Sequence, residues 1–257
     1  MRKLALPLIF ILLVSIGNAQ PSSTDKITFP VPKITVEVGK AQNSGDLAVT
    51  LQILLLMTIL SLAPAIIILT TSFTRIIVVF HFLKQALGVQ QMPPSQVLVG
   101  LALFLTFFIM SPVWDKINKD ALQPYLRNEI TQAEAYEKAI EPLREFMFKQ
   151  VREDDLALFV SLAKLPKPNN RNEIPTYVLI PAFAISELKI AFQIGFLIYV
   201  PFLMIDLIVA SVLMSMGMIM LPPVMISLPF KILLFILIDG WHLVVQSFIQ
   251  SFHLKFM

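Results

Sequence analysis

"IAFQIGFLIYVPFLMIDLIVASVLMSMGMIMLPPVMISLPF", residues 190–230, contains one charged side chain, Asp206, in 41 positions. A single helix of that length would measure roughly 60 Å, about twice the hydrocarbon thickness of a bilayer. The stretch must therefore turn within itself. The best place for the turn is 217–223, which begins with Gly217 and ends in two consecutive prolines. This pattern predicts two membrane-spanning helices joined by a short loop.

Methionine occupies every second position just before the end of this turn, at Met214, Met216, Met218 and Met220. Residues two apart point to opposite sides of a helix, whereas in an extended segment all four side chains would line one side. Irregular backbone at membrane depth is tolerated only inside protein or beside an aqueous cavity. We therefore expect an extended, methionine-lined loop at a lumen, where flexible side chains can seal an apolar constriction. The alternative is that these methionines fill gaps between packed helices.

The composition of the whole chain points to a membrane protein. Of its 257 residues 56% are hydrophobic and 14% are charged, against about a quarter charged in soluble domains. The net charge is +3 and the basic residues are spread, so no footprint for nucleic acid is present. Two uncharged runs, 47–73 and 97–114, are long enough to span a bilayer. Together with the segments that follow residue 190, they predict four spans arranged as two helical hairpins.

The N-terminal residues carry the features of a secretory signal. A basic start, an apolar run and a small residue at Ala19 predict a signal peptide over 1–19, with an uncleaved anchor helix as the alternative. Residues 20–46 are polar and rich in proline and glycine, which is typical of a loose lead-in. Residues 74–96 contain Arg75 and Lys84 but no acid, so we expect a short cytoplasmic loop there.

Most of the charge lies in residues 115–189, which hold 11 basic and 12 acidic side chains. Thr131 and Glu134 have the spacing of a helix capping box, and Pro142 stands where a following helix would begin. Residues 165–175 have the composition of a loop. We expect a small helical extracytoplasmic insertion. The sequence thus predicts an all-α polytopic membrane protein with a signal peptide (1–19), a lead-in (20–46), a first membrane hairpin (47–114), the insertion (115–189) and a second membrane hairpin with the Met-rich loop (190–257).

Several long motifs resemble one family. They are "TSFTRIIVVF" (71–80), "ALGVQQMPPSQVLVGLALFLTFFIMSPV" (86–113), "PLREFMFKQVREDDLALF" (142–159) and the block from "PAFAISELK" to "LIDGWHL" (181–243). Together they are similar to the FliP family of flagellar export-gate proteins, whose counterparts, the SctR family, serve injectisomes. The resemblance covers nearly the whole chain from about residue 50 onward.

The resemblance implies a function in the flagellar basal body, at the bacterial inner membrane. Members assemble as a homo-oligomer with two smaller membrane proteins of the FliQ and FliR type and with larger export-apparatus subunits, and unfolded flagellar substrates pass through the gate. A methionine loop forms the gasket, and by motif it falls on Met218, Ile219 and Met220. Ile219 departs from the usual methionine triple and is stiffer because it is β-branched. The resemblance also implies that the helices can sit above the membrane plane after assembly.

Charges within the apolar segments need partners, because an unpaired charge at the bilayer centre costs about 2.5 to 3.5 kcal/mol. By resemblance, Glu187 and Lys231 form a salt bridge between neighbouring subunits. Without the resemblance, Glu187 would end a helix in solvent and Lys231 would extend its amine to the membrane surface. Asp206 and Asp239 are expected to be buried charges in contacts between helices or subunits.

Two aspartates in apolar helices also suggest a different class of protein. Asp206 and Asp239 could serve an intramembrane aspartyl enzyme or a proton-coupled carrier. The proteases of that class carry Gly-x-Gly-Asp, whereas residues 237–241 read "LIDGW", and no inverted repeat of a carrier is evident. The three histidines lack metal-ligand spacing, and no nucleophile or phosphate-binding motif occurs. We therefore expect no catalytic residue, no cofactor and no metal site, and conclude that the chain is not an enzyme.

Overall fold

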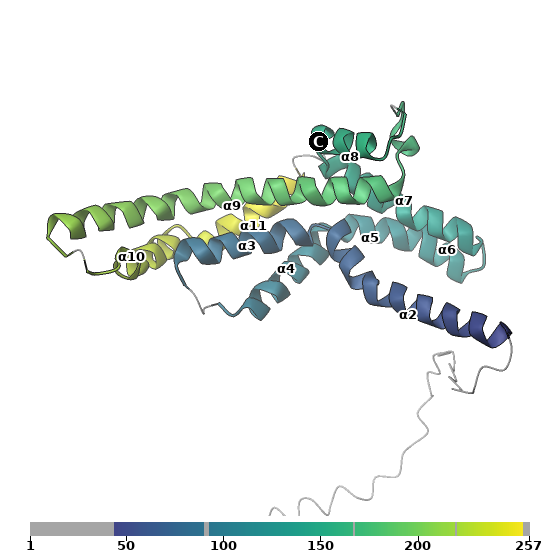
Figure 1. Ribbon diagram of the computed structural model, residues 1–257, viewed down its shortest axis with the longest axis horizontal. Coiled ribbons are helices and arrows are strands. Elements are labelled where there is room, and N and C mark those ends of the chain that lie inside the picture. Colours follow the sequence, from purple (N-terminus) through teal and green to yellow (C-terminus); the bar gives the residue numbers. More distant parts are fainter. Residues whose placement is uncertain (1–43, 90–92, 167, 219, 254–257) are drawn as a thin grey trace, which may run out of the picture. The chain divides into compact units, whose positions relative to one another are not determined.

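The computed structural model describes residues 44–89, 93–166, 168–218 and 220–253 (Figure 1). Within these ranges every regular element is a helix, which confirms the all-α prediction. The predicted signal peptide lies outside the described residues, as does nearly all of the lead-in. The elements are α2 (Ser44–Thr70), α3 (Phe73–Leu87), α4 (Ser95–Ile109), α5 (Ser111–Ile117), the π-helical turn η1 (Asn118–Leu122), α6 (Gln123–Leu126), α7 (Gln132–Gln150), α8 (Glu153–Leu162), the 3-10 turn η2 (Arg171–Glu173), α9 (Thr176–Ser215), α10 (Pro223–Leu237) and α11 (Gly240–His253).

Two helices are long and apolar enough to cross a membrane, Val49–Thr70 within α2 and the whole of α9. Two further helix pairs qualify if each counts as one bent span. The break is 58° between α4 and the helices from Ser111 to Leu126, and 61° between α10 and α11. The described residues therefore contain two to four candidate spans, and the predicted number of four is the upper limit.

Helix α3 corrects the predicted cytoplasmic loop at 74–96. Ile76, Val79, Phe80 and Leu83 are buried, and their spacing matches one face of a helix. This face packs along α9, and the two helices run side by side in Figure 1. The prediction of a loop was wrong because it weighed the two basic residues and overlooked the apolar periodicity around them.

Helix α9 begins inside the predicted insertion and continues without a break into the predicted span. Its 40 residues correspond to a length of about 60 Å. The first part is buried against α3, α7 and α8, and includes the fully buried Leu179 and Phe183. The later part is largely exposed. The helix ends at Ser215, just before the turn that was expected at 217–223.

The insertion contains one confirmed cap and one correction. At the start of α7, the Thr131 hydroxyl accepts a hydrogen bond from the Glu134 amide, and the Glu134 carboxylate accepts one from the Thr131 amide, as the capping box predicts. Pro142 does not begin a new helix but lies inside α7. A proline inside a helix costs about 3 kcal/mol, and burial of Phe146 and Met147 in the following turns offsets that cost.

Aromatic pairs join the helices in the core. Phe80 of α3 meets Phe248 of α11 edge to face, with ring centroids 5.3 Å apart. Phe146 of α7 meets Phe183 of α9 in the same way at 5.8 Å. Such pairs add about 0.5–1.5 kcal/mol each to the burial of their area. The core therefore fixes the first part of α9 between α3 and α7.

Candidate functional site

A glycine, Gly217, ends α9 and begins the loop that follows it. The Gly217 amide donates to the Met214 carbonyl at 3.0 Å, and the Met218 amide donates to the Leu213 carbonyl at 2.9 Å. These two bonds are the Schellman pattern, and Gly217 has the positive φ of 77° that the pattern requires. On the other side, Pro223 is the first residue of α10, a position that suits a residue without an amide hydrogen. The sequence thus fixes both ends of the loop.

The methionines are not arranged as one extended strand. Met214 lies in the last turn of α9, and Met216 is the helical C-cap, so the expected extended segment is wrong for these two residues. Only Met218 and Met220 follow the end of the helix. Met220 is 98% exposed, and Met218 is half-buried. Ile219, the third predicted gasket residue, lies outside the described residues.

Below the loop, three polar side chains join α9 to α10. Asp206 of α9 accepts a hydrogen bond from the Ser227 hydroxyl at 2.5 Å and one from Lys231 Nζ at 2.6 Å. Lys231 is 3% exposed and Asp206 is 18% exposed. Within this chain, Asp206 is therefore a mostly buried charge in a contact between two helices. Lys231 does not extend its amine to solvent.

A second buried ion pair holds α9 against α3. Arg75 binds both oxygens of Glu187, with Nε donating to Oε2 at 2.8 Å and Nη2 pairing with Oε1. The same guanidinium donates to Gln150 of α7 and Ser251 of α11, both at 3.2 Å, and lies 3.9 Å from the centre of the Phe252 ring. Four helices thus converge on one arginine, which sequence reasoning had placed in a loop.

The structure does not bring Glu187 and Lys231 together within one chain. Glu187 is bonded to Arg75, and Lys231 is bonded to Asp206. The predicted salt bridge concerns neighbouring subunits, so it stays a prediction. The spacing of the apolar residues around Arg75 could have placed this arginine on a helix in the core, but it does not identify the partner of the arginine.

A third polar contact, which the sequence did not suggest, lies one residue away on α9. The Ser186 hydroxyl donates to Asp155 Oδ2 of α8 at 2.9 Å and accepts a hydrogen bond from the Arg152 amide at 3.0 Å. Ser186 and Glu187 therefore hold α8 and α3 to the same turn of α9. These contacts fix the base of the long helix that carries the loop.

Asp239 differs from Asp206 in its surroundings. It is exposed, so the expectation of a buried charge is not met within the single chain. It has a positive φ of 51° at the junction between α10 and α11, a conformation that aspartate tolerates better than most residues. Gly240 follows it because a Cβ there would lie 2.2 Å from the Phe235 ring. The Asp-Gly pair thus forms a helix junction, and none of the hydrogen bonds described joins it to Asp206.

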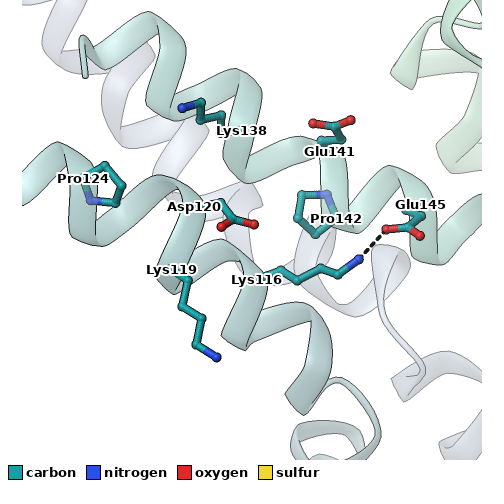
Figure 2. Close-up of a pocket in the computed structure, with 8 residues that line it drawn as sticks. All are labelled: Lys116, Lys119, Asp120, Pro124, Lys138, Glu141, Pro142 and Glu145. Atoms are coloured by element: carbon teal, nitrogen blue, oxygen red, sulfur yellow. Dashed lines mark hydrogen bonds and ion pairs between the residues drawn. The ribbon is translucent and has the colours of Figure 1, made fainter. Parts of the chain in front are cut away.

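A charged hollow of about 540 Å³ lies in the insertion, between the α5–η1 segment and α7 (Figure 2). Figure 2 shows Lys116 reaching across it to Glu145, with Nζ and Oε2 2.8 Å apart. The hydrogen bond from Lys116 lowers the pKa of Glu145. Lysines and acids line the hollow together and are exposed, so this is a solvated surface. Among the described residues, no group of three or more histidine, aspartate or glutamate side chains could hold a metal ion.

Comparisons with known proteins identify the family of this chain. The sequence pattern of the FliP family matches residues 56–248. The chain is 58% identical over 217 residues to the flagellar biosynthetic protein FliP of Bacillus subtilis, covering 84% of this chain and 98% of that protein. It is 52% identical to the protein of the same name from Aquifex aeolicus, covering 86% and 92% of the two chains. The corresponding values for the Borreliella burgdorferi protein are 46% identity with 98% and 100% coverage. The chain, with its two to four candidate spans, is therefore a multi-pass membrane protein and belongs to the FliP family.

Proposed function

We propose that this chain is the pore-forming component of the flagellar protein export gate in the bacterial inner membrane. It assembles with copies of itself, with two smaller partners of the FliQ and FliR type and with the larger export-apparatus subunits. The assembly conducts unfolded flagellar substrates, and the loop formed by Met218, Ile219 and Met220 seals it. The observation that carries the proposal is the position of this loop, because Met220 is almost fully exposed at the tip of a long apolar hairpin.

The chemistry of the loop suits a seal that must open for many different polypeptides. Methionine side chains are unbranched and polarizable, so they re-pack around different shapes. An apolar constriction blocks ions because it does not hold water. The Schellman end of α9 and the proline start of α10 leave only a short segment between two helices. A ring of such segments from several copies would close a pore while leaving each tip deformable.

The exposed surface of α9 supports assembly into an oligomer. Large apolar side chains are exposed from Tyr177 near its start to Met214 near its end. The helix is about 60 Å long, whereas the hydrocarbon core of a bilayer is about 30 Å thick. Lipid can cover only part of this length, which leaves exposed apolar surface available for contact with neighbouring subunits.

The alternative of a carrier or aspartyl enzyme has no support from a specific observation. Asp206 is held by Ser227 and Lys231, and Asp239 is exposed at a helix junction. Two carboxylates that act together must share a proton or bind the same water molecule. The contacts described join no such pair here. Because the chain itself is proposed to catalyse no reaction, the energy for export would come from partner subunits or from the proton gradient.

The test is the ion conductance of membranes that contain the assembled gate. Replacing Met218, Ile219 and Met220 together by alanine is expected to cause an ion leak, because the seal loses most of its apolar volume. Met225→Ala is the matched control, because Met225 is also exposed but lies on α10, outside the loop. A tight membrane with an intact assembly in the triple variant would show that the constriction lies elsewhere. A leak in the control of the same size would show that the effect is not specific to the loop.

A further inference from the structure

The hairpin that carries the methionine loop has a strong polar contact between its two helices. Asp206 of α9 binds Ser227 and Lys231 of α10, with oxygen to oxygen and oxygen to nitrogen distances of 2.5 and 2.6 Å. Ser227 is fully buried and Lys231 is nearly so. Separating such groups leaves a charge in apolar surroundings, which costs far more than loosening an apolar contact. The contact therefore holds α9 and α10 at one separation where these three residues meet.

From the level of this contact toward the loop, an open hollow of about 440 Å³ lies along α9 and α10. Its walls are apolar side chains that include Val212 and Leu213 of α9 and Ile226 and Phe230 of α10. Contacts between such side chains have no preferred direction. They permit several separations of the two helices, so the apolar part of the hairpin does not by itself fix the tip.

We propose that the contact of Asp206 with Ser227 and Lys231 sets the separation of α9 and α10 at the tip and so positions Met218 and Met220. The part about the seal rests on the function proposed above. Asp206 lies nine residues before the end of α9 at Ser215, about 14 Å along the helix. Lys231 lies eight residues after the start of α10 at Pro223, about 12 Å along that helix. A small change in the angle between α9 and α10 at this contact therefore moves the loop by a larger distance. The three residues are positioning residues and do not themselves line the constriction.

The separation of the helices can be measured directly, because the chain contains no cysteine. Cysteines introduced at Val212 and Met225, both exposed, take spin labels on the two helices near the tip. Pulsed electron resonance on the full-length protein then gives the distribution of distances between the labels. Asp206→Asn is expected to shift the mean distance to larger values and to broaden the distribution, because the carboxylate no longer holds the ammonium.

Two further variants separate positioning from general damage. The exchanged pair Asp206→Lys with Lys231→Asp is expected to restore the narrow distribution, which an unfolded or misassembled protein would not do. Asp239→Asn is the matched control, because this aspartate is exposed at the other end of α10 and its backbone conformation suits asparagine. If Asp206→Asn does not accumulate, Ser227→Ala tests the same contact and is expected to give a smaller shift in the same direction.

The result that overturns the inference is an unchanged, equally narrow distribution in Asp206→Asn. A shift that the exchanged pair does not reverse would also overturn it, because the effect would then come from lost stability. Conductance is measured in parallel. A tight membrane in the Met218, Ile219 and Met220 alanine variant would refute the seal itself, and the distances would still decide whether the contact sets the tip.

Discussion

Arg75→Met is expected to destabilise the fold strongly. The substitution keeps the length and most of the apolar volume of the side chain but removes the guanidinium that binds Glu187. Both partners are buried, at 1% and 0% exposure. Breaking a buried ion pair by removing one partner costs about 3–5 kcal/mol, because the remaining charge stays in apolar surroundings. That range corresponds to roughly a 100-fold to 4,000-fold change in the ratio of folded to unfolded protein.

The assay is equilibrium unfolding of the purified protein in detergent, followed by helical circular dichroism. A double variant, Arg75→Met with Glu187→Met, is expected to lose less stability than the single variant, because replacing both charges removes the cost of burying one alone. Lys116→Met is the surface control. The side chains of Lys116 and Glu145 are 54% and 46% exposed, so their ion pair contributes at most about 1 kcal/mol.

Two results would refute this reasoning about Arg75. One is a loss below about 1 kcal/mol in Arg75→Met, which would mean that solvent reaches the pair. The other is a double variant at least as unstable as the single one, which would mean that the guanidinium acts through Gln150, Ser251 and Phe252 and not through Glu187. Arg75→Lys separates charge from shape, because lysine cannot form the two parallel bonds to a carboxylate.

Gly217→Ala is expected to destabilise the end of α9 by about 1–2 kcal/mol, because alanine is strained at a positive φ of 77°. Faster amide exchange at Met218 would report the loss, whereas Gly100→Ala, where a Cβ meets nothing within 4 Å, is expected to have no such effect. A second prediction concerns pH and the cap of α7. The hydrogen bond from the Thr131 amide lowers the pKa of Glu134 below its ordinary value of 4.5, so the cap contributes fully above pH 4.5 and is lost as the pH falls through the lower folded pKa. The protection of the Thr131 amide against exchange, relative to the intrinsic rate at each pH, is expected to fall in that acidic range. Unchanged protection, or the same pH dependence in Glu134→Gln, would contradict the assignment.

The sequence predicts those features of the fold that depend on local chemistry. Helices, the capping box of Thr131 and Glu134, and the break in the helix near Gly217 follow from spacing and from backbone preferences. The prediction at Pro142 was wrong because a local rule cannot weigh the packing of Phe146, one turn further along α7, against Phe183 of α9. Propensity gives way to tertiary packing at such a position.

The partners of the buried charges could not be predicted from the sequence. Arg75 and Glu187 are 112 positions apart, and nothing local in either segment identifies the other. Asp206 and Lys231 are 25 positions apart, on two helices of one hairpin, so only the register of that hairpin brings them together. The rule that a charge in an apolar segment needs a partner gave the need correctly for Asp206. The rule does not identify the partner of Asp206, and it does not apply to Asp239, which is exposed in this chain.

The length of α9 shows why hydropathy alone cannot place these helices relative to the bilayer. Transmembrane helices tilt by at most about 40°, and a helix of about 60 Å at that tilt still extends about 46 Å along the membrane normal. The hydrocarbon core is about 30 Å thick, so part of the apolar surface of α9 must leave it at any ordinary tilt. Exposed residues near both ends, Tyr177 and Met214, show that the surface outside the core is also apolar. Lipid and a neighbouring subunit present the same apolar chemistry to a side chain, so a hydropathy scale does not distinguish them. The excess length of α9 over the bilayer therefore supports the proposal that other subunits cover part of this helix.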